Sequence, residues 1–309
     1  MKEKAMNKYS LSTLALIVIA TLSAFAQQPP DVALQKDLVY GQAGGADLLL
    51  NLARPAAADA PLPAIVYVHG GGWQAGNKDE SEPLIRLLAS YGYVAVSVGY
   101  RLTPANKWPA QIRDAKCAVR YLRANAAQLG IDPDNIGAIG DSAGGHLVLL
   151  LALMDGTGPL DESGGNPGPS SKVKAVVNLF GPTDFPSWQP RPLGLSDIRR
   201  GFRKSFDDLL VDFIGTADRS ADVMKEVSPI TYIDPGDPPV LTFHGEKDPL
   251  VPVDQARALH QALDKADVPN RLVVVEKAAH GWGGEKYENT LRLTREFFDK
   301  HLKGIPEPK

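Results

Sequence analysis

The stretch 140–145 reads Gly-Asp-Ser-Ala-Gly-Gly and decides how the rest of the chain is interpreted. It follows a short apolar run, 135–140, and opens a helical pattern that continues to residue 154. A chain that turns sharply from a strand into a helix needs small residues around the turn, and the helix N-terminus favours negative charge there. The stretch therefore predicts a strand, a tight turn and a helix, with Ser142 as a candidate nucleophile. A glycine-rich turn with a capping serine is the alternative interpretation.

Strand-like and helical patterns alternate on both sides of this turn. The strand-like runs are 62–69, 93–100, 135–140, 173–180, 240–244 and 271–276. The helical patterns are 80–91, 108–128, 142–154, 253–266 and 285–302. Short apolar strands that alternate with helices predict an α/β fold with a mostly parallel sheet covered by helices on both faces. Residues 46–54 are expected to add an antiparallel edge hairpin.

Two segments interrupt the alternation. Residues 155–171 are rich in glycine, proline and serine, which predicts a loop. Residues 182–208 contain Trp188, several prolines and a basic run formed by Arg199, Arg200, Arg203 and Lys204. A long excursion between two core strands is usually functional or disordered, so both segments are expected to be loop or cap insertions. With no internal repeat and no evident boundary, residues 27–309 are expected to form one domain.

The first 26 residues differ from the rest of the chain. Lys2, Lys4 and Lys8 precede an apolar run, 11–25, and Ala24-Phe25-Ala26 offers small residues at the positions that a signal peptidase recognises. The run is short for a membrane span, which needs about 20 apolar residues. We therefore expect a signal peptide cleaved after Ala26, export to the periplasm or the medium, and no stable membrane insertion after cleavage.

Composition narrows the kinds of protein to which this chain can belong. The 309 residues carry a net charge of -3 and contain no basic block, which argues against a nucleic-acid partner. The chain has one cysteine, so it forms no internal disulfide and must be held together by its core. That residue, Cys117, lies in an apolar helical pattern, which predicts a buried and inert thiol.

A second glycine-rich stretch, 69–73, reads His-Gly-Gly-Gly-Trp and ends an earlier strand. Consecutive glycines let a backbone approach a ligand closely, and N–H groups aimed at one point stabilise a developing oxyanion. We expect the N–H groups of Gly71, Gly72 and Ala143 to form such an oxyanion hole, with His69 bracing the loop. A tight structural turn is the alternative.

The general base is expected to follow the nucleophile and the acid along the chain. His280 lies in the loop after the last strand-like run, and catalytic groups collect at the carboxyl ends of strands in open α/β sheets. His244 ends the preceding run and is the competing base. His146 is one helical turn beyond the serine and is expected to point away from it. His260 and His301 fall within helical patterns and are expected to be surface or packing residues.

Asp248 is the expected acid. It lies in the loop that follows the run 240–244, one strand–helix unit before His280. A carboxylate there would hold the tautomer of the imidazole and stabilise the imidazolium. Glu246 and Asp254 are the runners-up and Asp184 is a weaker one. Each has a solvated loop carboxylate or a helix cap as its default interpretation, and Asp254 looks like a first-turn residue of the next helix.

Together these motifs resemble the hormone-sensitive-lipase-like esterases and, more closely, the bifunctional feruloyl/acetyl-xylan esterases. The resemblance covers roughly residues 38–302. It rests on HGGGW at 69–73, YRL at 100–102, WPAQIRDAKCAVRYLR at 108–123, GDSAGGHL at 140–147, SPITYI at 228–233, HGEKDPLVP at 244–252 and HGW at 280–282. It implies an α/β-hydrolase fold and a catalytic triad of Ser142, Asp248 and His280. The stretch 182–208 matches no pattern of the family.

We therefore expect a serine hydrolase that cleaves short-acyl carboxylic esters through an acyl-enzyme, with no metal and no organic cofactor. The substrate is expected to be a small-molecule or polysaccharide ester, for example acetyl or feruloyl groups on plant polysaccharide, as for an acetyl xylan esterase. Trp73 and Trp188 are candidate substrate contacts, although packing on its own domain is the alternative for Trp188.

Two other functions remain open at this point. The first is amide hydrolysis, as by arylformamidases or exopeptidases, which resemble this chain in the same motifs. The second is a non-catalytic binding module on a hydrolase scaffold. Such modules typically lose the serine or the histidine, whereas Ser142, Asp248 and His280 are all present here.

Overall fold

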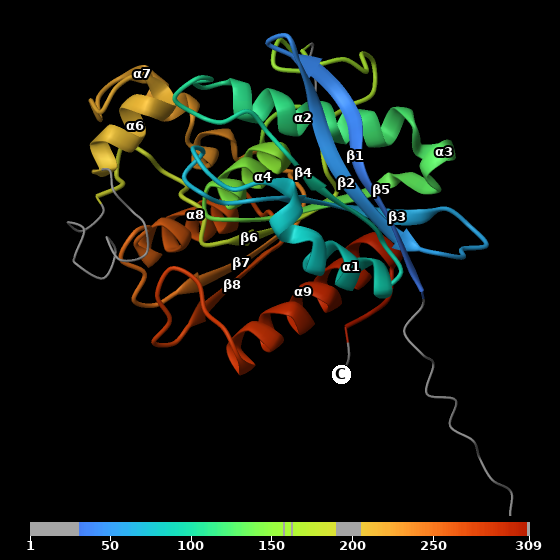
Figure 1. The fold of residues 1–309 in the computed structure, drawn as a ribbon. Coiled ribbons are helices and arrows are strands. Elements are labelled where there is room, and N and C mark those ends of the chain that lie inside the picture. Colours follow the sequence, from blue (N-terminus) through green and yellow to red (C-terminus); the bar gives the residue numbers. More distant parts are fainter. Residues whose placement is uncertain (1–30, 157, 162, 190–204, 308–309) are drawn as a thin grey trace, which may run out of the picture.

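The computed structural model describes residues 31–156, 158–161, 163–189 and 205–307. Their strands form an eight-stranded sheet in the order β1-β2-β4-β3-β5-β6-β7-β8 (Figure 1). The strands are β1 Val32–Ala43, β2 Ala46–Pro55, β3 Leu62–Val68, β4 Val94–Val98, β5 Ile131–Asp141, β6 Ala175–Leu179, β7 Val240–Gly245 and β8 Asn270–Val275. The β1–β2 and β2–β4 pairs are antiparallel, and every other pair is parallel. The mostly parallel sheet expected from the sequence is confirmed.

Helices cover both faces of this sheet, as the alternation predicted (Figure 1). The helices are α1 Glu82–Ser90, α2 Ala110–Ala124, α3 Ala126–Leu129, α4 Ala143–Leu153, α6 Phe206–Ile214, α7 Asp222–Glu226, α8 Val253–Lys265 and α9 Glu285–Lys303, with 3-10 turns η1 Lys78–Ser81 and η2 Pro229–Tyr232. One apolar core joins α1 and α9 to the sheet, and a second joins α2, α4 and α8 to the other face. All eleven residues of α4 are buried, so the helix that follows Ser142 is held on every side.

The edge of the sheet differs from the expectation in one respect. The hairpin predicted around residues 46–54 exists, but its second strand, β2, is not at the edge because it pairs with β4. The edge strand is β1, whose twelve residues were not recognised as a strand. Its pairing with β2 is interrupted twice, and Asp37 has a φ of 57° at the first irregularity. Such bulges break the strict alternation that identifies a strand in a sequence.

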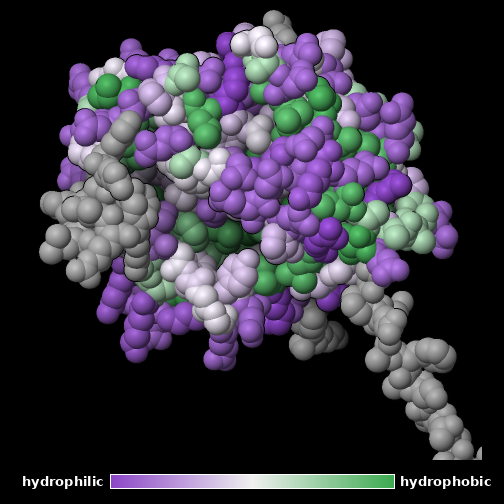
Figure 2. All heavy atoms as spheres, in the orientation of Figure 1, coloured by the Kyte–Doolittle hydropathy of each residue, from purple (hydrophilic) through white to green (hydrophobic). Residues whose placement is uncertain are grey.

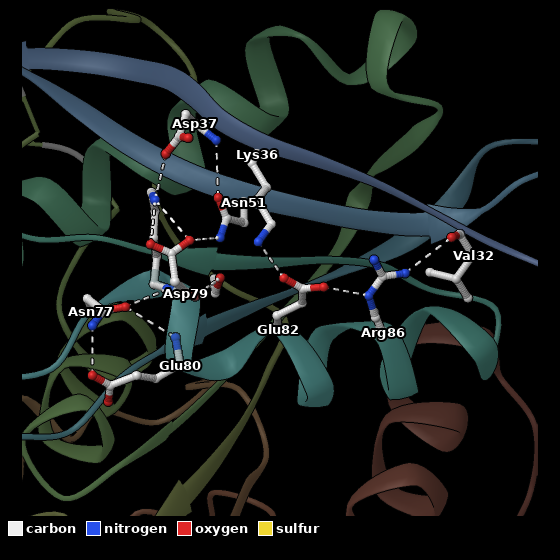
Figure 3. Close-up of polar contacts among 11 residues, drawn as sticks. Val32, Lys36, Asp37, Asn51, Asn77, Asp79, Glu80, Glu82 and Arg86 are labelled. Carbon is white, nitrogen blue, oxygen red and sulfur yellow. Dashed lines mark hydrogen bonds and ion pairs between the residues drawn. The ribbon is translucent and has the colours of Figure 1, made fainter.

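Polar contacts connect this hairpin to the segment that follows the 69–73 loop (Figure 3). Lys78 Nζ lies 2.7 Å from an Asp37 carboxylate oxygen and 3.2 Å from one of Asp79. Asn51 donates to the same Asp79 carboxylate at 2.7 Å and accepts from the Asp37 N–H at 3.1 Å. The Asn77 side chain accepts from the backbone N–H groups of Asp79 and Glu80 and so caps η1. The C-terminal end of the 69–77 segment is thereby fixed to the sheet.

The loop expected at 155–171 is a loop in the described structure, and buried cations of α2 hold it. Lys116 Nζ donates to the Asp155 carbonyl at 2.7 Å, to the Asp161 carboxylate at 2.9 Å and to Ser171 Oγ at 3.2 Å. Arg120 donates to carbonyl groups of the same loop. Because these charged donors bind several acceptors of the loop, this glycine-rich segment is tied to the core.

The surface is mixed. On the face drawn in Figure 2, hydrophilic side chains cover most of the molecule, and hydrophobic ones show between them in separate groups.

Cys117 is buried, and burial raises the pKa of its thiol, as expected of an inert cysteine. Within the described ranges, no helix combines the length and the apolar character that a membrane crossing requires. The expected signal peptide, 1–26, and the four basic residues at 199–204 lie outside the described residues.

Candidate functional site

Ser142 lies at the turn between β5 and α4, in a backbone conformation that few residues adopt. Its φ is 51° and its ψ is -118°. A side chain on Gly144 would collide with the Val68 carbonyl of the neighbouring strand, which explains the glycine at that position. The Ser142 N–H donates to the Leu179 carbonyl at 2.8 Å. The turn is therefore clamped between β3 and β6, and the strained serine projects from it.

The carboxyl ends of the parallel strands bring three distant side chains together. Ser142 follows β5, Asp248 follows β7 and His280 follows β8. His280 Nε2 lies 2.9 Å from Ser142 Oγ, and His280 Nδ1 lies 2.7 Å from Asp248 Oδ2. The Asp248 side chain is fully buried and that of His280 is 11% exposed. Strands that run in the same direction end at the same edge, so residues that are far apart in sequence meet there.

The direction of the hydrogen bonds follows from the chemistry of the three groups. An ionised carboxylate only accepts, so His280 Nδ1 donates to Asp248. A neutral imidazole with its proton on Nδ1 has a lone pair on Nε2, and that lone pair faces the Ser142 hydroxyl. The arrangement can therefore accept a proton from Ser142 Oγ as that oxygen attacks a substrate. We call Ser142, His280 and Asp248 the relay.

The competing acids and bases are engaged elsewhere. The Asp254 side chain is 80% exposed and pairs with Arg257. Glu246 accepts from the Lys277 N–H on the surface. Asp184 is tied through its backbone to the Gln255 side chain. His244 is buried behind Asp248 and does not contact the serine in the described structure.

The glycine loop, residues 69–73 after β3, is held by polar contacts beside the elbow, which is the turn between β5 and α4 that carries Ser142. Gly71, Gly72 and Trp73 have φ values of 107°, 59° and 58°. Asp141, which precedes the serine, accepts from the Gly70 N–H at 3.1 Å and from the Tyr67 hydroxyl at 2.5 Å. These contacts join the segment that carries Gly71 and Gly72 to the elbow that carries Ala143. The loop is thus rigid at the point where the three N–H groups are expected to act.

His69 lies at the base of the same loop. Its ring stacks on Tyr100 at 4.3 Å between centroids, and the Tyr100 hydroxyl donates to the His69 carbonyl at 3.0 Å. The residue is buried, and burial lowers the pKa of its imidazole. These contacts agree with the expectation that His69 braces the loop.

Trp73 does not present its ring to a substrate. It is almost fully buried and stacks on Phe213 of α6 at 4.1 Å between centroids. Its indole N–H donates to His146 Nδ1 of α4 at 3.3 Å. The ring therefore fastens the glycine loop to two helices, which contradicts the expectation that Trp73 contacts substrate directly.

Trp188 is also a packing residue. It is 4% exposed, and its ring contacts Phe185 and Phe206 at 5.3 and 4.1 Å between centroids. Its indole N–H donates at 3.0 Å to the carbonyl of Leu250, two residues after the relay acid. With its ring covered and its N–H in use, Trp188 packs on its own domain, which is the alternative stated above, and its ring is not placed to stack on a substrate. The residue instead anchors the turn that carries Asp248.

Helix α6 is not predicted by the sequence analysis. It begins within the unassigned segment 182–208 and continues beyond it. The Ser205 side chain and Asp208 form a reciprocal capping box that starts this helix. The apolar residues Phe206, Leu209, Leu210 and Phe213 recur at helical spacing, so the sequence held the signal. Leu209 Cδ1 lies 3.3 Å from the position that a Cβ on Gly72 would occupy. The helix therefore lies directly against the glycine loop.

The buried imidazole of His146 predicts an acid-sensitive stability. Its Nε2 donates to the Val227 carbonyl at 2.6 Å, and its Nδ1 accepts from the Trp73 indole. Burial lowers the pKa of His146 from 6.5 to about 4. Between these pH values the unfolded chain takes up a proton that the folded chain excludes, so stability falls as pH falls through this window. The loss amounts to about 3 kcal/mol and is complete below the folded pKa.

This expectation is tested by denaturant unfolding of the wild type and His146→Gln between pH 7 and the lower end of that window. Glutamine keeps a donor for Val227 and does not titrate, so the variant should lose less stability than the wild type. If the unfolding free energies of the two proteins fell in parallel with pH, His146 would not be the cause of the acid sensitivity.

No group of three or more His, Cys, Asp or Glu side chains that could hold a metal ion occurs within the described ranges. The relay itself uses one histidine and one aspartate, which contact each other, and the histidine also contacts the serine.

Comparison with known proteins defines the family. The BD-FAE family model matches residues 50–263. The chain belongs to the BD-FAE family. The match includes the glycine loop, the elbow and Asp248, and the eight-stranded sheet with helices on both faces is the α/β-hydrolase fold. His280 lies beyond the matched residues.

Individual relatives agree with this membership. The probable carboxylic ester hydrolase LipM of Mycobacterium tuberculosis is 35% identical over 240 residues, which are 75% of this chain and 52% of LipM. The chain spans about half the length of the curated relatives that it matches first.

Two solved structures are similar over almost their whole length. Esterase 2 of Thermogutta terrifontis with bound propionate is 32% identical, with a TM-score of 0.71 and coverage of 91% of this chain and 97% of that one. A truncated carbohydrate esterase from gut microbiota is 25% identical, with a TM-score of 0.73 and coverage of 90% and 99%.

Proposed function

We propose that this member of the BD-FAE family is a carboxylic-ester hydrolase that works through an acyl-enzyme. The observation that carries the proposal is the relay, in which 2.9 Å separates Ser142 Oγ from His280 Nε2 and 2.7 Å separates His280 Nδ1 from Asp248 Oδ2. The esterase names of the similar proteins support the same chemistry.

In the first half of the reaction, Ser142 Oγ attacks the ester carbonyl carbon while His280 Nε2 accepts the hydroxyl proton. The N–H groups of Gly71, Gly72 and Ala143 stabilise the negative oxygen of the tetrahedral intermediate. His280 then donates its proton to the departing alcohol oxygen, the C–O bond breaks, and the acyl group stays on Ser142. Throughout, Asp248 holds the imidazole in place and stabilises its charged form.

In the second half, water takes the place of the alcohol. His280 accepts a proton from this water, and the oxygen attacks the acyl carbon with the same three N–H groups receiving the negative charge. Collapse of the intermediate breaks the bond to Ser142 Oγ, which recovers its proton from His280. The products are the carboxylic acid and the alcohol, and the relay is restored.

The proposed substrates are short-acyl esters outside the cytoplasm, including acetyl or feruloyl groups on plant polysaccharide. The family and the similarity to a carbohydrate esterase from gut microbiota support a carbohydrate as the alcohol part of the ester. The basic, apolar and small-residue pattern of residues 1–26 supports export to the periplasm or the medium.

The direct test is release of p-nitrophenol from p-nitrophenyl acetate by the purified chain, followed by release of acetate from acetylated xylan and of ferulate from feruloylated arabinoxylan. Hydrolysis of the aryl ester supports carboxylic-ester hydrolysis. The two polysaccharides then show whether the enzyme releases acetyl or feruloyl groups. A p-nitroanilide of the same acyl group, cleaved faster than the ester, would contradict the proposal in favour of amide hydrolysis.

Leu209 is expected to restrict the acyl or alkyl chain that the site accepts. Its half-buried side chain lies against Gly72, one of the proposed oxyanion donors. We expect kcat/KM to fall from p-nitrophenyl acetate to butyrate to octanoate. Leu209→Ala should raise the octanoate-to-acetate ratio by about tenfold, the scale on which a hydrophobic contact discriminates between substrates.

Val211→Ala is the matched control, because Val211 lies on the same helix and is 42% exposed. This variant should leave the ratio unchanged. A wild type that prefers octanoate, or an unchanged ratio in Leu209→Ala, would contradict the assignment.

A further inference from the structure

The buried imidazole of His244 lies directly behind the acid of the relay. His244 is the fifth residue of β7 and its side chain is fully buried. Its Nε2 lies 2.7 Å from the Val251 carbonyl oxygen and 3.5 Å from Asp248 Oδ2. Asp248 Oδ2 is also the oxygen that lies 2.7 Å from His280 Nδ1. One carboxylate oxygen therefore stands between two imidazoles.

The contacts of His244 define its protonation. A carbonyl oxygen only accepts, so Nε2 must carry a proton and donate it to Val251. Nδ1 is buried and has no hydrogen-bond partner within the described residues. A second proton on Nδ1 would place an unpaired N–H and a charge in the interior, and burial accordingly lowers the pKa of His244. His244 is therefore a neutral, fixed donor.

The turn after β7 connects this donor to the Asp248 carboxylate through Val251. Asp248 Oδ1 accepts from the N–H groups of Leu250 at 2.9 Å and Val251 at 3.0 Å. The carbonyl of the same Val251 accepts from His244. The Asp248 carboxylate cannot rotate without breaking these contacts, so one oxygen stays with the turn and the other stays with His280.

We propose that His244 is a positioning residue of the relay. Its Nε2–H, directed at the Val251 carbonyl with Asp248 Oδ2 beside it, holds the carboxylate so that Oδ2 faces His280 Nδ1. His244 itself touches neither the serine nor the substrate, and it acts through Asp248. This role rests on the proposed function, because Asp248 and His280 carry the chemistry that it serves.

The tautomer of His244 gives a test that needs no turnover. Nitrogen-15 NMR of histidine-labelled wild type at the pH of the assay should show His244 neutral with its proton on Nε2. A proton on Nδ1, or an imidazolium, would overturn the proposal. Since this measurement is independent of activity, its failure is distinguishable from failure of the proposed esterase function.

A double-mutant cycle gives the kinetic test. His244→Phe should lower kcat by about tenfold with little change in KM, within the range of couplings between residues in contact. His244→Gln, whose amide places a donor near the position of Nε2, should recover most of the loss. In an Asp248→Asn background, His244→Phe should cost less than about twofold, because the group through which it acts has been changed.

His260→Phe is the control for removing a buried histidine away from the relay, and it should leave kcat and KM unchanged. Equal losses from His244→Phe in both backgrounds would overturn the proposal, as would a glutamine variant as impaired as the phenylalanine variant. If His244→Phe does not fold, His244→Leu takes its place in the same cycle, with the same supporting and contradicting results, and the NMR tautomer is judged as above.

Discussion

Ser142→Ala is expected to lower kcat for p-nitrophenyl acetate by about a millionfold, the loss found when a triad nucleophile is removed in a comparable enzyme. The reason is that Oγ is the atom that bonds to the substrate, and the neighbouring groups only assist it. The residual rate should come from the oxyanion N–H groups and substrate binding. Initial rates at saturating substrate, with the variant purified on unused resin to exclude carried-over wild type, provide the measurement.

Three controls separate a loss of chemistry from a loss of folding in this experiment. Ser220→Ala removes a hydroxyl from an exposed loop and should keep wild-type turnover. Ser142→Ala should unfold at a denaturant concentration close to that of the wild type, because the hydroxyl is not a cap of α4. A fluorophosphonate should add its mass to the wild-type peptide that contains Ser142 and not to that of the variant. A variant that retained a tenth of wild-type turnover would show that the proposed mechanism is wrong.

Asp248→Asn should lower kcat by about 10⁴-fold, less than the roughly millionfold loss expected for His280→Ala. An asparagine amide can donate to His280 Nδ1, and the imidazole then has its lone pair on Nδ1 and its proton on Nε2, facing Ser142. The imidazole would hold the wrong tautomer and could not accept the serine proton. The order of severity follows because the acid orients the base, whereas the base moves the proton.

Glu246→Gln and Asp254→Asn provide matched carboxylate-to-amide controls in the same part of the chain. Both side chains are engaged on the surface, Glu246 with the Lys277 N–H and Asp254 with Arg257, so both variants should stay close to wild-type kcat. If either lost more activity than Asp248→Asn, the acid would have to be reassigned.

The contrast between Glu246 and Asp248 shows where reasoning from the sequence stops. The two residues lie in one loop, two positions apart, and both are acids after the same strand. Chain order admits both residues, and the resemblance of HGEKDPLVP to the family's motif favours Asp248, but the sequence does not give the distance from either carboxylate to His280. In the structure the Asp248 carboxylate is drawn inward by two N–H groups of its own turn, whereas Glu246 reaches outward.

The tryptophans show a different kind of error. Trp73 and Trp188 are candidate substrate contacts in the sequence, with packing on its own domain as the alternative for Trp188. Each has instead found an aromatic partner and an acceptor for its indole N–H, as a buried tryptophan requires. Their partners, Phe213 and Phe206, belong to α6, which was not recognised. The unassigned helix thus supplies a packing partner to Trp188, which lies nearby in the chain, and to Trp73, which lies more than a hundred positions before it.

The sequence by itself determined the alternation of strands and helices, the elbow at Ser142, the glycine loop and the order along the chain of the proposed nucleophile, acid and base. These features depend on the local order of residues, because apolar periodicity and the small residues of a turn act over a few positions. Only the tertiary structure decided that β1 is the edge strand, that α6 lies against Gly72, that the two tryptophans pack inward and that His244 lies behind Asp248. Those outcomes depend on contacts between residues far apart in the chain, whose side-chain directions are settled by packing and by the need of each buried polar group for a partner.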